Sequence, residues 1–313
     1  MSDPLVSVVI PAYNRPRKLE RALQSVLDQQ YSAIEIIVVD DYSSPPIREV
    51  LTVEDLPSSS IQIIRHDENR GGSAARNTGI DAAEGEYIAF LDDDDEWRKT
   101  KIDQQVRVFQ SASEELGLVY TGIEQRDSGG KINGVTRPET PRNIKKRLLL
   151  DDFIGTFSSI MVRSEVPEAV GKLDERFPSW QDWEFYIRVV QSYEVRAIPD
   201  PLVIRHNEGE QISDNFERKK NTTVPLLIDK YRPLADEYGW TFKRKWLANL
   251  NFRLGYSALS NAKYDEGKRF LRRSIRMNPF AVEPYLYLVF AVGGKRTYEP
   301  ARRLRRALVR KLN

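Results

Sequence analysis

Four consecutive carboxylates, Asp92 to Asp95, follow directly after an apolar run at residues 87–91. The apolar run is typical of a buried strand, so the four acids are expected where that strand ends. Neighbouring carboxylates repel one another, and carboxylate oxygens are the hard ligands that Mg²⁺ and Mn²⁺ prefer, often together with a substrate's phosphates. The segment therefore predicts a site for a metal-bound phosphate compound. The alternative is a solvated acidic turn that caps the next helix.

Polar residues also follow two other predicted strands: Tyr13 and Asn14 come after the first strand, and Asp40 and Asp41 end the second. A nucleotide fits such residues, because the Tyr13 ring can stack on a base and Asp41 can accept a hydrogen bond from a base N–H. The alternatives are a loop aromatic that covers the sheet edge, for Tyr13, and a turn cap, for the two acids.

An alternation of strands and helices must position these residues. Apolar runs and amphipathic segments predict strands at 6–12, 34–41, 61–67 and 87–91, and helices at 17–29 and 74–83. Gly71 and Gly72 open the second of these helices, with Ser73 as its expected cap. The pattern predicts a parallel α/β sheet with right-handed crossovers, in which ligands bind beyond the carboxyl ends of the strands. The polar loops are thus expected to converge on one crevice.

Four segments carry a family resemblance: VSVVIPAYNR, IIVVDDYS, NRGGSAARNTGI and GEYIAFLDDDDEW. In this order and spacing they are similar to the family 2 glycosyltransferases of the GT-A fold, over roughly residues 5–206. The resemblance implies an α/β, Rossmann-like fold for a nucleotide-diphospho-sugar transferase, an inverting reaction and an acidic motif of the DxD type. It names a class of reaction and no particular sugar, and it favours UDP as the nucleotide.

The resemblance also assigns roles to residues on the donor side. Asp94 would be the main ligand of a divalent Mn or Mg ion, which the imidazole of His206 would approach. Arg76 would lie near the diphosphate, on a helix whose N-terminus favours anions. The residues implied to bind the nucleotide sugar are Pro11, Ala12, Tyr13, Asn14, Arg15, Asp41, Arg76, Asp92 and Asp93. The alternatives are a surface salt bridge for Arg76 and a loop histidine bonded to a carbonyl for His206.

On the acceptor side, the segment at residues 171–190 ends in a predicted helix. The family commonly has a Glu-Asp pair here whose Asp is the general base, so the resemblance makes Asp182 the catalytic base, with Gln181 in place of the Glu. Trp180 and Trp183 flank the acid, and indoles can raise its pKa by desolvation or stack on an acceptor sugar. The alternative is a helix cap flanked by core tryptophans.

Charge divides the chain of 313 residues into two parts. Residues 1–215 hold 25 basic and 38 acidic side chains, whereas residues 216–313 hold 23 basic and 8 acidic ones. We therefore expect a GT-A domain at 1–215 and a basic helical region at 216–313 that faces an anionic partner or docks on its acidic neighbour. The chain has no cysteine, which excludes disulfides and thiolate metal sites.

The basic region is expected to be wholly helical. Residues 251–279 predict two helices joined near 262–265, similar to a tetratricopeptide-type hairpin.

No apolar stretch reaches the roughly 18 residues that a membrane span needs. In a final helix from Pro300, leucines recur every four residues among arginines, which is typical of a helix lying on an anionic bilayer. A peripheral position on the cytoplasmic face of a membrane is thus expected. Nucleic acid is not, because no stacking aromatics accompany the basic residues.

These observations predict a metal-dependent inverting glycosyltransferase that moves a sugar from a nucleotide-diphospho-sugar to a glycan or a lipid-linked acceptor. Two alternatives stay open. One is a catalytically silent binder of sugar nucleotides or glycans, which the replacement at Gln181 favours. The other is a metal-dependent phosphohydrolase with Asp92 as nucleophile and Asp94 as acid, although the Tyr13 and Asp41 loops would have no role in it.

Overall fold

The computed structural model describes residues 3–51, 61–206, 215–298 and 300. Two compact units make up the chain. The larger holds residues 1–145, 153–175 and 181–208, and the helical unit holds residues 146–152, 176–180 and 209–313. Two short segments from the first part of the chain, 146–152 and 176–180, therefore belong with the C-terminal helices. The division of the chain expected at residue 216 does not include these two segments.

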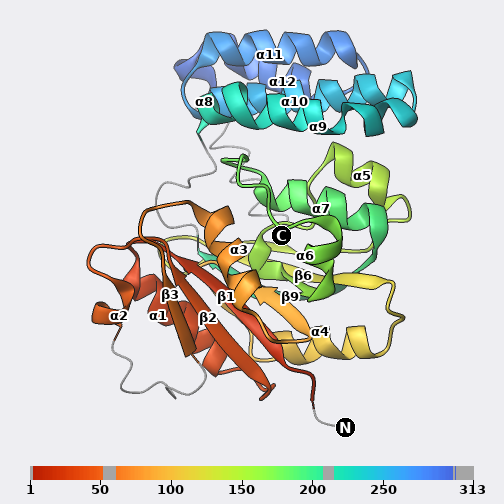
Figure 1. Cartoon of the computed structure of the whole chain (residues 1–313). Helices are drawn as coiled ribbons and strands as arrows, with labels where there is room; N and C mark the ends of the chain where they lie inside the picture. Colours follow the sequence, from red (N-terminus) through yellow and green to blue (C-terminus); the bar gives the residue numbers. More distant parts are fainter. Residues whose placement is uncertain (1–2, 52–60, 207–214, 299, 301–313) are drawn as a thin grey trace. The chain divides into compact units, whose positions relative to one another are not determined.

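A mixed sheet forms the centre of the larger unit (Figure 1). Its strands are β1 (Val6–Ala12), β2 (Ile34–Asp40), β3 (Ile61–Arg65), β4 (Tyr87–Phe90), β5 (Asp95–Trp97), β6 (Leu116–Arg126), β7 (Ile132–Thr136), β8 (Ile160–Arg163) and β9 (Glu194–His206). The order is β3-β2-β1-β4-β8-β6-β9-β5, with β7 paired to β6. The predicted parallel sheet is confirmed for β3, β2, β1 and β4. Beyond β4 the sheet is mixed, because β8 runs antiparallel to both β4 and β6.

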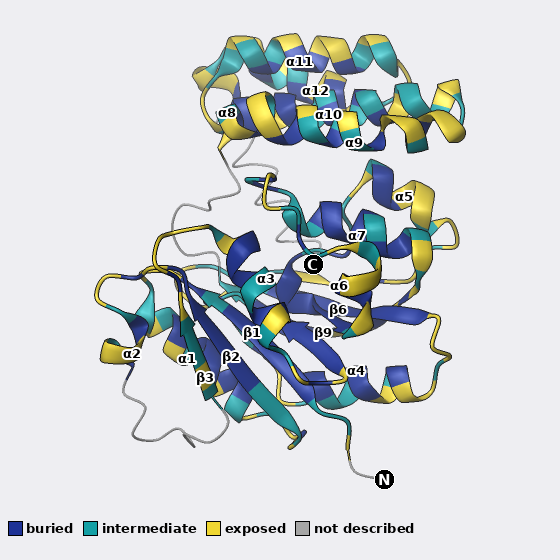
Figure 2. Ribbon diagram, in the orientation of Figure 1, coloured by how far each residue is buried: buried dark blue, intermediate teal, exposed yellow. Residues whose placement is uncertain are grey.

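The helices of the larger unit are α1 (Pro16–Leu27), α2 (Ile47–Val50), α3 (Gly72–Ala82), α4 (Lys101–Gln110), α6 (Glu165–Val170) and α7 (Gln181–Ser192), whereas most of α5 (Ile144–Leu150) belongs to the helical unit. The strands β1 and β2 are buried along most of their length, as continuous apolar runs require (Figure 2). The apolar face of α1, with Leu19, Leu23 and Val26, packs into the same core. This core fixes the strand ends that carry the polar loops.

Strand register brings those ends to one edge of the sheet. Ala12 pairs with Asp40, and Asp40 pairs with Arg65, so β1, β2 and β3 end side by side. The backbone N–H of Leu91 donates to the carbonyl of Val9 at 3.0 Å, which places the start of the acidic run beside β1. The predicted convergence of the loops thus follows from the parallel pairing of these strands.

Two glycines let α3 lie close to this edge. Gly71, at the N-cap of α3, has φ +88°, a left-handed conformation that favours glycine. The expected cap, Ser73, lies inside the helix and makes no capping hydrogen bond. A Cβ on Gly79 would lie 2.3 Å from Cγ1 of Val9, so only glycine allows α3 to pack this closely on β1.

The helical unit has its own apolar core. It contains α8 (Phe216–Arg218), the π-helical turn η4 (Lys219–Thr223), α9 (Val224–Glu237), α10 (Trp240–Ser260), α11 (Tyr264–Met277) and α12 (Val282–Ala291). The predicted hairpin at residues 251–279 is confirmed as the end of α10 and the whole of α11. Leu259, Leu271, Tyr287, Ala291 and Tyr298 form the buried cluster of this unit.

The terminal helix predicted from Pro300 falls almost wholly on residues 301–313, outside the described residues. Among the residues that are described, no helix combines the length and the apolar character needed to cross a bilayer.

Candidate active site

The loops after β1 and β2 are tied together. Asn14 has φ +54°, and its backbone N–H donates to Ser43 Oγ at 2.9 Å, while its side-chain oxygen accepts from the N–H of Ser44 at 2.8 Å. This exchange leaves the neighbouring Tyr13 ring 42% exposed at the sheet edge, where it can meet a ligand. Pro11 and Ala12 contribute the last residues of β1 beneath it.

Asp40 organises the end of β2. Its carboxylate accepts hydrogen bonds from the backbone N–H groups of Ser43 and Ile47, at 2.8 and 3.1 Å, and from Arg65 at 2.5 Å. Burial pushes the pKa of Asp40 up, but these hydrogen bonds bring it below its ordinary value. Asp40 is therefore a charged, structural carboxylate that shapes the loop.

Asp41 is also held by the chain itself. Its Oδ1 accepts from the N–H of Arg70 at 2.9 Å and contacts His66 Nδ1 at 2.8 Å, and its Oδ2 accepts from the N–H of Gly71 at 2.8 Å. The carboxylate thus joins β2 to the N-terminus of α3. A base could reach it only as an additional partner, because both oxygens already accept hydrogen bonds.

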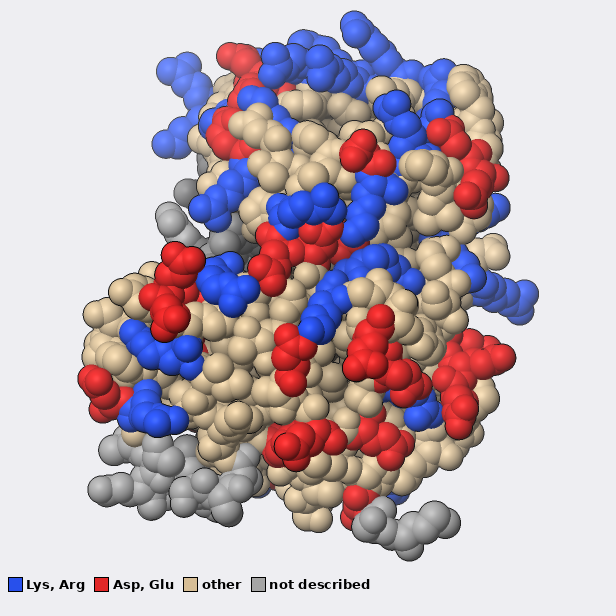
Figure 3. Space-filling view, in the orientation of Figure 1, with Lys and Arg blue, Asp and Glu red and all other residues tan. Residues whose placement is uncertain are grey.

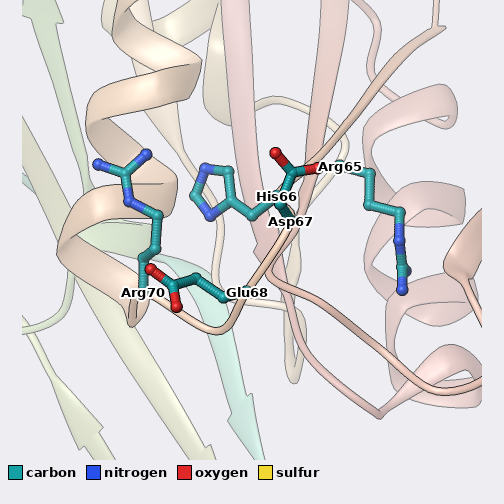
Figure 4. Close-up of a pocket in the computed structure, with 5 residues that line it drawn as sticks. All are labelled: Arg65, His66, Asp67, Glu68 and Arg70. Carbon is teal, nitrogen blue, oxygen red and sulfur yellow. The ribbon is translucent and has the colours of Figure 1, made fainter.

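A polar pocket of about 490 Å³ opens beside this carboxylate (Figure 4). Its lining consists of Arg65, His66, Asp67, Glu68 and Arg70, all from the end of β3 and the loop that follows. Figure 4 shows Arg65 and His66 extending to opposite sides of the strand, as consecutive strand residues do. The pocket therefore combines cationic groups with the His66–Asp41 contact at the carboxyl edge of the sheet.

The repulsion within the acidic run is relieved by arginines of the chain. Arg15 donates to Asp94 Oδ2 at 2.7 Å and lies 3.2 Å from Asp93 Oδ1. Arg76 forms an ion pair with Asp92, whose other oxygen accepts from Thr156 Oγ1 at 2.8 Å. These ion pairs offset part of the repulsion, so the composition of the run alone does not require a bound metal.

Asp92 stays charged in this setting. Burial pushes its pKa up, but the charge and hydrogen bond of Arg76, together with the Thr156 hydrogen bond, bring it below the ordinary value. Both of its oxygens are engaged by Arg76 and Thr156. This argues against the nucleophilic role that a phosphohydrolase would give to Asp92.

Asp95 behaves in the opposite way. It is 2% exposed, and burial raises its pKa well above the ordinary value, with the charge of Asp92 adding to the effect. Ser158 Oγ lies 2.7 Å from its carboxylate and also accepts the backbone N–H of Asp92 at 3.0 Å. Asp95 is therefore a buried, proton-holding anchor for the loop.

Asp93 is the unsatisfied member of the run. It is 4% exposed, and its Oδ2 has no hydrogen-bond partner among the described residues. Burial raises the pKa of Asp93 to about 7, against the lowering effect of Arg15. A buried carboxylate oxygen without a partner is costly, which indicates a ligand or cation as its functional partner.

Asp182, the predicted base, is the second residue of α7 and half-buried. Its Oδ1 accepts from the N–H of Trp183 at 2.8 Å. Burial raises its pKa, the charge of Asp92 raises it further, and Arg76 and Arg205 act in the opposite direction. Asp182 thus lies within electrostatic reach of the acidic run and has the raised pKa that suits a base.

The two flanking tryptophans differ. Trp183 is 1% exposed and belongs to the core, so its indole offers no ring to a sugar, and the stacking role expected for it does not hold in this structure. Trp180 is half-buried, has φ +60°, and lies under the cations Lys219 and Arg253, at 5.7 and 5.9 Å from its ring centre. Only Trp180 keeps an accessible face.

His206, at the end of β9, contacts Glu96 Oε1 at 2.5 Å, and Arg21 Nε lies 3.2 Å from the same oxygen. Asp94 is paired with Arg15 instead. Across the described ranges, no cluster of three or more His, Cys, Asp or Glu side chains is arranged to hold a metal ion. The expected ligands Asp94 and His206 are therefore not preassembled as a closed metal site.

Sequence reasoning missed the residues that hold the acidic run. Thr156, directly before the 3-10 turn η2 (Phe157–Ser159), contacts Asp92. Ser158, within that turn, contacts Asp95. The charge of Arg205 of β9 acts to lower the pKa of Asp92, Asp95 and Asp182. At Asp95 and Asp182 it only opposes the larger effect of burial, which raises the pKa. No local motif marks these residues, because they meet the acids only through the pairing of distant strands.

Comparisons with known proteins agree on the class of enzyme. The family described as Glycosyl transferase family 2 matches residues 7–165. An uncharacterised glycosyltransferase of Haemophilus influenzae is 29% identical over 273 residues, covering 85% of this chain and 88% of that protein. The UDP-Glc:alpha-D-GlcNAc-diphosphoundecaprenol beta-1,3-glucosyltransferase WfgD of Escherichia coli is 26% identical over 241 residues, covering 76% and 91%.

Solved structures share the fold. The mannosyltransferase PcManGT of Pyrobaculum calidifontis, in complex with GDP-Man and Mn²⁺, aligns with a TM-score of 0.59 and 16% identity over 100% of this chain and 87% of that one. S. aureus TarS 1-349, in complex with UDP-GlcNAc, aligns with a TM-score of 0.56 and 17% identity over 90% and 91%. With the family match covering about half of the sequence, the chain belongs to glycosyl transferase family 2 and is a GT-A-fold glycosyltransferase.

Proposed function

We propose that this glycosyltransferase is metal-dependent and inverting, and that it transfers a sugar from a UDP-sugar to a hydroxyl of a lipid-linked glycan. The observation that carries the proposal is the buried Oδ2 of Asp93, which has no hydrogen-bond partner among the described residues, while Oδ1 lies 3.2 Å from Arg15. WfgD, whose name gives a UDP-sugar donor and a diphosphoundecaprenol acceptor, supports both substrates.

The donor would bind along the carboxyl edge of the sheet. The pocket beside Asp41 and the exposed Tyr13 ring suit the nucleoside, since one offers polar groups and the other a stacking face. Arg15 and Arg76 suit the diphosphate, because a guanidinium binds phosphate oxygens through two parallel hydrogen bonds. Both arginines now neutralise carboxylates, so phosphate binding would redistribute these ion pairs.

Asp182 would act as the general base. Its carboxylate takes the proton of the acceptor hydroxyl, the acceptor oxygen forms a bond to the anomeric carbon on the face opposite the leaving group, and the bond from that carbon to the nucleoside diphosphate breaks. Arg15 and Arg76 would stabilise the negative charge that develops on the diphosphate. Gln181, where the family commonly has Glu, leaves Asp182 as the only carboxylate of this pair.

A divalent cation fits the acidic run only in part. Asp93 Oδ2 is a buried hard oxygen without a partner, and Asp94 follows it, so these two acids would hold the ion. When bound, such a cation would supply positive charge that offsets the charge of the departing diphosphate. Asp94 would have to exchange Arg15 for the metal, and His206 would have to exchange Glu96. Donor phosphates would complete the ligands, as is common for Mg²⁺.

We place the enzyme at the cytoplasmic face of a membrane, where a lipid-linked acceptor would be available. Removing residues 301–313, which include most of the predicted basic terminal helix, should weaken membrane association. A cut at residue 296 would be a poorer test, because it also removes Tyr298, which is 1% exposed in the core of the helical unit. Unchanged membrane association after the shorter deletion would refute a role for that helix.

A thermal-shift titration tests the donor and the metal together. The purified protein is titrated with UDP, GDP, CDP and dTDP, each with and without Mn²⁺. We expect UDP with Mn²⁺ to stabilise the fold by about 2.7 kcal/mol at 100 times its Kd. Asp94→Ala should abolish the metal-dependent part of this shift. Asp265→Ala, which removes a carboxylate whose side chain is 97% exposed in the helical unit, serves as the matched control.

No stabilisation by any nucleotide would contradict the proposed donor site. A shift with UDP that is unaffected by Mn²⁺ or by Asp94→Ala would contradict the metal but keep the donor. The silent-binder alternative, which Gln181 favours, predicts the full shift together with no turnover of UDP-sugar in the presence of lipid-linked acceptors.

A further inference from the structure

One helix of the helical unit presents an apolar face to solvent. The large apolar side chains exposed along α12 and at its two ends are Phe280, Val282, Tyr285, Leu286, Val289 and Val292, which we call the α12 stripe. Phe280 is 92% exposed and Val289 66% exposed. A contiguous apolar surface of this kind is unusual on a soluble protein and indicates an interaction site.

The stripe follows from the register of the helix. Pro284, Tyr287 and Ala291 of α12 are buried, and Tyr287 and Ala291 belong to the core of the unit. Residues three and four apart share one face of a helix, so the stripe residues Val282, Leu286 and Val289 lie on the face opposite to the buried one. The helix therefore already has its core contact, and the stripe is a second apolar face.

Basic side chains flank this stripe in the sequence, on α11 before it and directly after α12. Arg272, Arg273 and Arg276 are exposed on α11, which packs against α12, and Lys295 and Arg296 are exposed directly after α12. None of the five makes an ion pair with an acidic side chain of the described residues. In Figure 3, Lys and Arg side chains crowd the surface of the helical unit along α11.

We propose that the α12 stripe and these five basic residues form a docking surface for an anionic lipid bilayer. Apolar side chains on one face with Lys and Arg beside them are the features of a helix that lies in the bilayer interface. Each basic residue near an anionic surface adds attraction, and the stripe supplies the apolar area that enters the acyl boundary. The surface belongs to described residues and is separate from residues 301–313.

A second copy of the chain is a poorer occupant. In a symmetric dimer the same patch meets itself, so the arginines of one protomer would approach those of the other. Like charges placed together without acids to neutralise them oppose such an interface. An anionic membrane is complementary to both parts of the surface at once.

Vesicle sedimentation tests the proposal with the full-length protein and no sugar nucleotide. The vesicles consist of phosphatidylcholine alone or of phosphatidylcholine with phosphatidylglycerol. We expect binding to the anionic vesicles that weakens at high salt. The double variant Leu286→Ser/Val289→Ser should bind about tenfold or more weakly, because it removes the apolar contact. Lys295→Gln/Arg296→Gln should weaken binding about fivefold for each charge removed.

Trp240→Ser is the matched control. Trp240 lies at the start of α10, is 64% exposed and is not part of the stripe, so its loss should leave vesicle binding unchanged. Thermal unfolding of each variant checks the fold, since exposed positions tolerate serine with little loss of stability.

Two results would overturn the proposal: no binding of the wild type to anionic vesicles, or equal binding of the stripe variant and the wild type. A stripe variant that changes only the oligomeric state, measured by light scattering, would assign the surface to a second copy instead. Because the assay contains no donor, its failure is distinguishable from a failure of the proposed transferase reaction.

Discussion

Within the acidic run, the carboxylates differ in their burial and in their partners, and these two factors shift the pKa of Asp92 and of Asp95 in opposite directions. Arg76 keeps the pKa of Asp92 low against the effect of burial, while burial dominates at Asp95 and raises its pKa. Arg15 contacts Asp94 and Asp93 without satisfying Asp93 Oδ2. Four identical side chains in sequence therefore become four chemically different groups.

The raised pKa of Asp93 predicts that the ionised carboxylate, which the proposed metal site needs, lowers the stability of the fold. Its value of about 7 in the folded chain exceeds the value of about 3.9 expected in the unfolded chain, so the folded state keeps a proton that the unfolded state has lost. The free energy of unfolding should therefore fall as pH rises from about 4 to about 7, by up to roughly 4 kcal/mol. Asp93→Asn should remove the contribution of Asp93, while Asp95 and Asp182, whose pKa values are also raised, keep theirs.

Urea unfolding at several pH values, in EDTA, measures the effect. At pH 8 we expect Asp93→Asn to be more stable than the wild type but unable to give the metal-dependent UDP shift. Asp265→Asn, at an exposed site, is the control and should follow the wild-type curve. A variant less stable than the wild type at pH 8 would contradict the raised pKa.

Asp182→Asn should separate binding from catalysis. Loss of a general base lowers kcat by about 10²- to 10⁴-fold, while the UDP-induced thermal shift should be retained because the donor contacts lie elsewhere. In the wild type the carboxylate must be ionised to accept a proton. Since its pKa is raised, activity should decline on the acidic side at a higher pH than for an ordinary carboxyl group. A full rate in Asp182→Asn would exclude the role.

Among the elements, α3 packs so closely against β1 that there is no space for a Cβ atom at Gly79. α3 carries Arg76 and begins where Asp41 accepts the N–H groups of Arg70 and Gly71. A shift of this helix would therefore move an arginine of the site as well as the loop that closes the pocket. The packing at Gly79 controls how near α3 lies to β1.

Gly79→Ala should consequently destabilise the larger unit and weaken UDP binding together. The new Cβ would lie 2.3 Å from Cγ1 of Val9, so helix and strand must separate, at a cost of about 1–3 kcal/mol. Gly134→Ala is the control, because its Cβ would find no atom closer than 3.7 Å. Urea unfolding and a UDP titration measure both effects, and equal stability of the two variants would contradict the packing argument.

At the scale of the whole molecule, each of the two units has a hydrophobic core of its own. The core under the sheet includes Val8, Ile36 and Trp97, and the core of the helical unit includes Leu271 and Tyr298. The proposed donor site lies on the first unit and the proposed membrane surface on the second. Acidic residues are concentrated in the first part of the sequence and basic residues in the second, in keeping with this division.

Tyr298→Ala tests the independence of the cores. Its side chain is 1% exposed and contacts the ring of Tyr264, with 6.1 Å between ring centres, so truncation should cost about 3–5 kcal/mol within the helical unit. The UDP-induced stabilisation should remain. Calorimetry with and without UDP measures both, with exposed Trp240→Ala as control. Loss of UDP binding in Tyr298→Ala would show that the two units are coupled.

Local sequence patterns were enough to predict the first four parallel strands, the helical hairpin and the class of enzyme. Apolar runs of the length of a strand and amphipathic helices are local patterns, and the four motifs that resemble family 2 are continuous segments. The parallel part of the sheet, the helical hairpin and the convergence of the loops at residues 13, 41 and 92 followed from them. These features depend on neighbours in sequence or on the general geometry of parallel sheets.

The pKa shifts, the ion pairs and the unpartnered oxygen of the acidic run depend instead on contacts between distant segments. Thr156, Ser158 and Arg205 reach the acidic run through strand pairings that no local pattern encodes. The fold buries Trp183 and leaves Trp180 half-buried, although the sequence predicted the same role for the two residues beside Asp182. The second apolar face of α12 emerged in the same way, because exposure depends on what the rest of the chain covers.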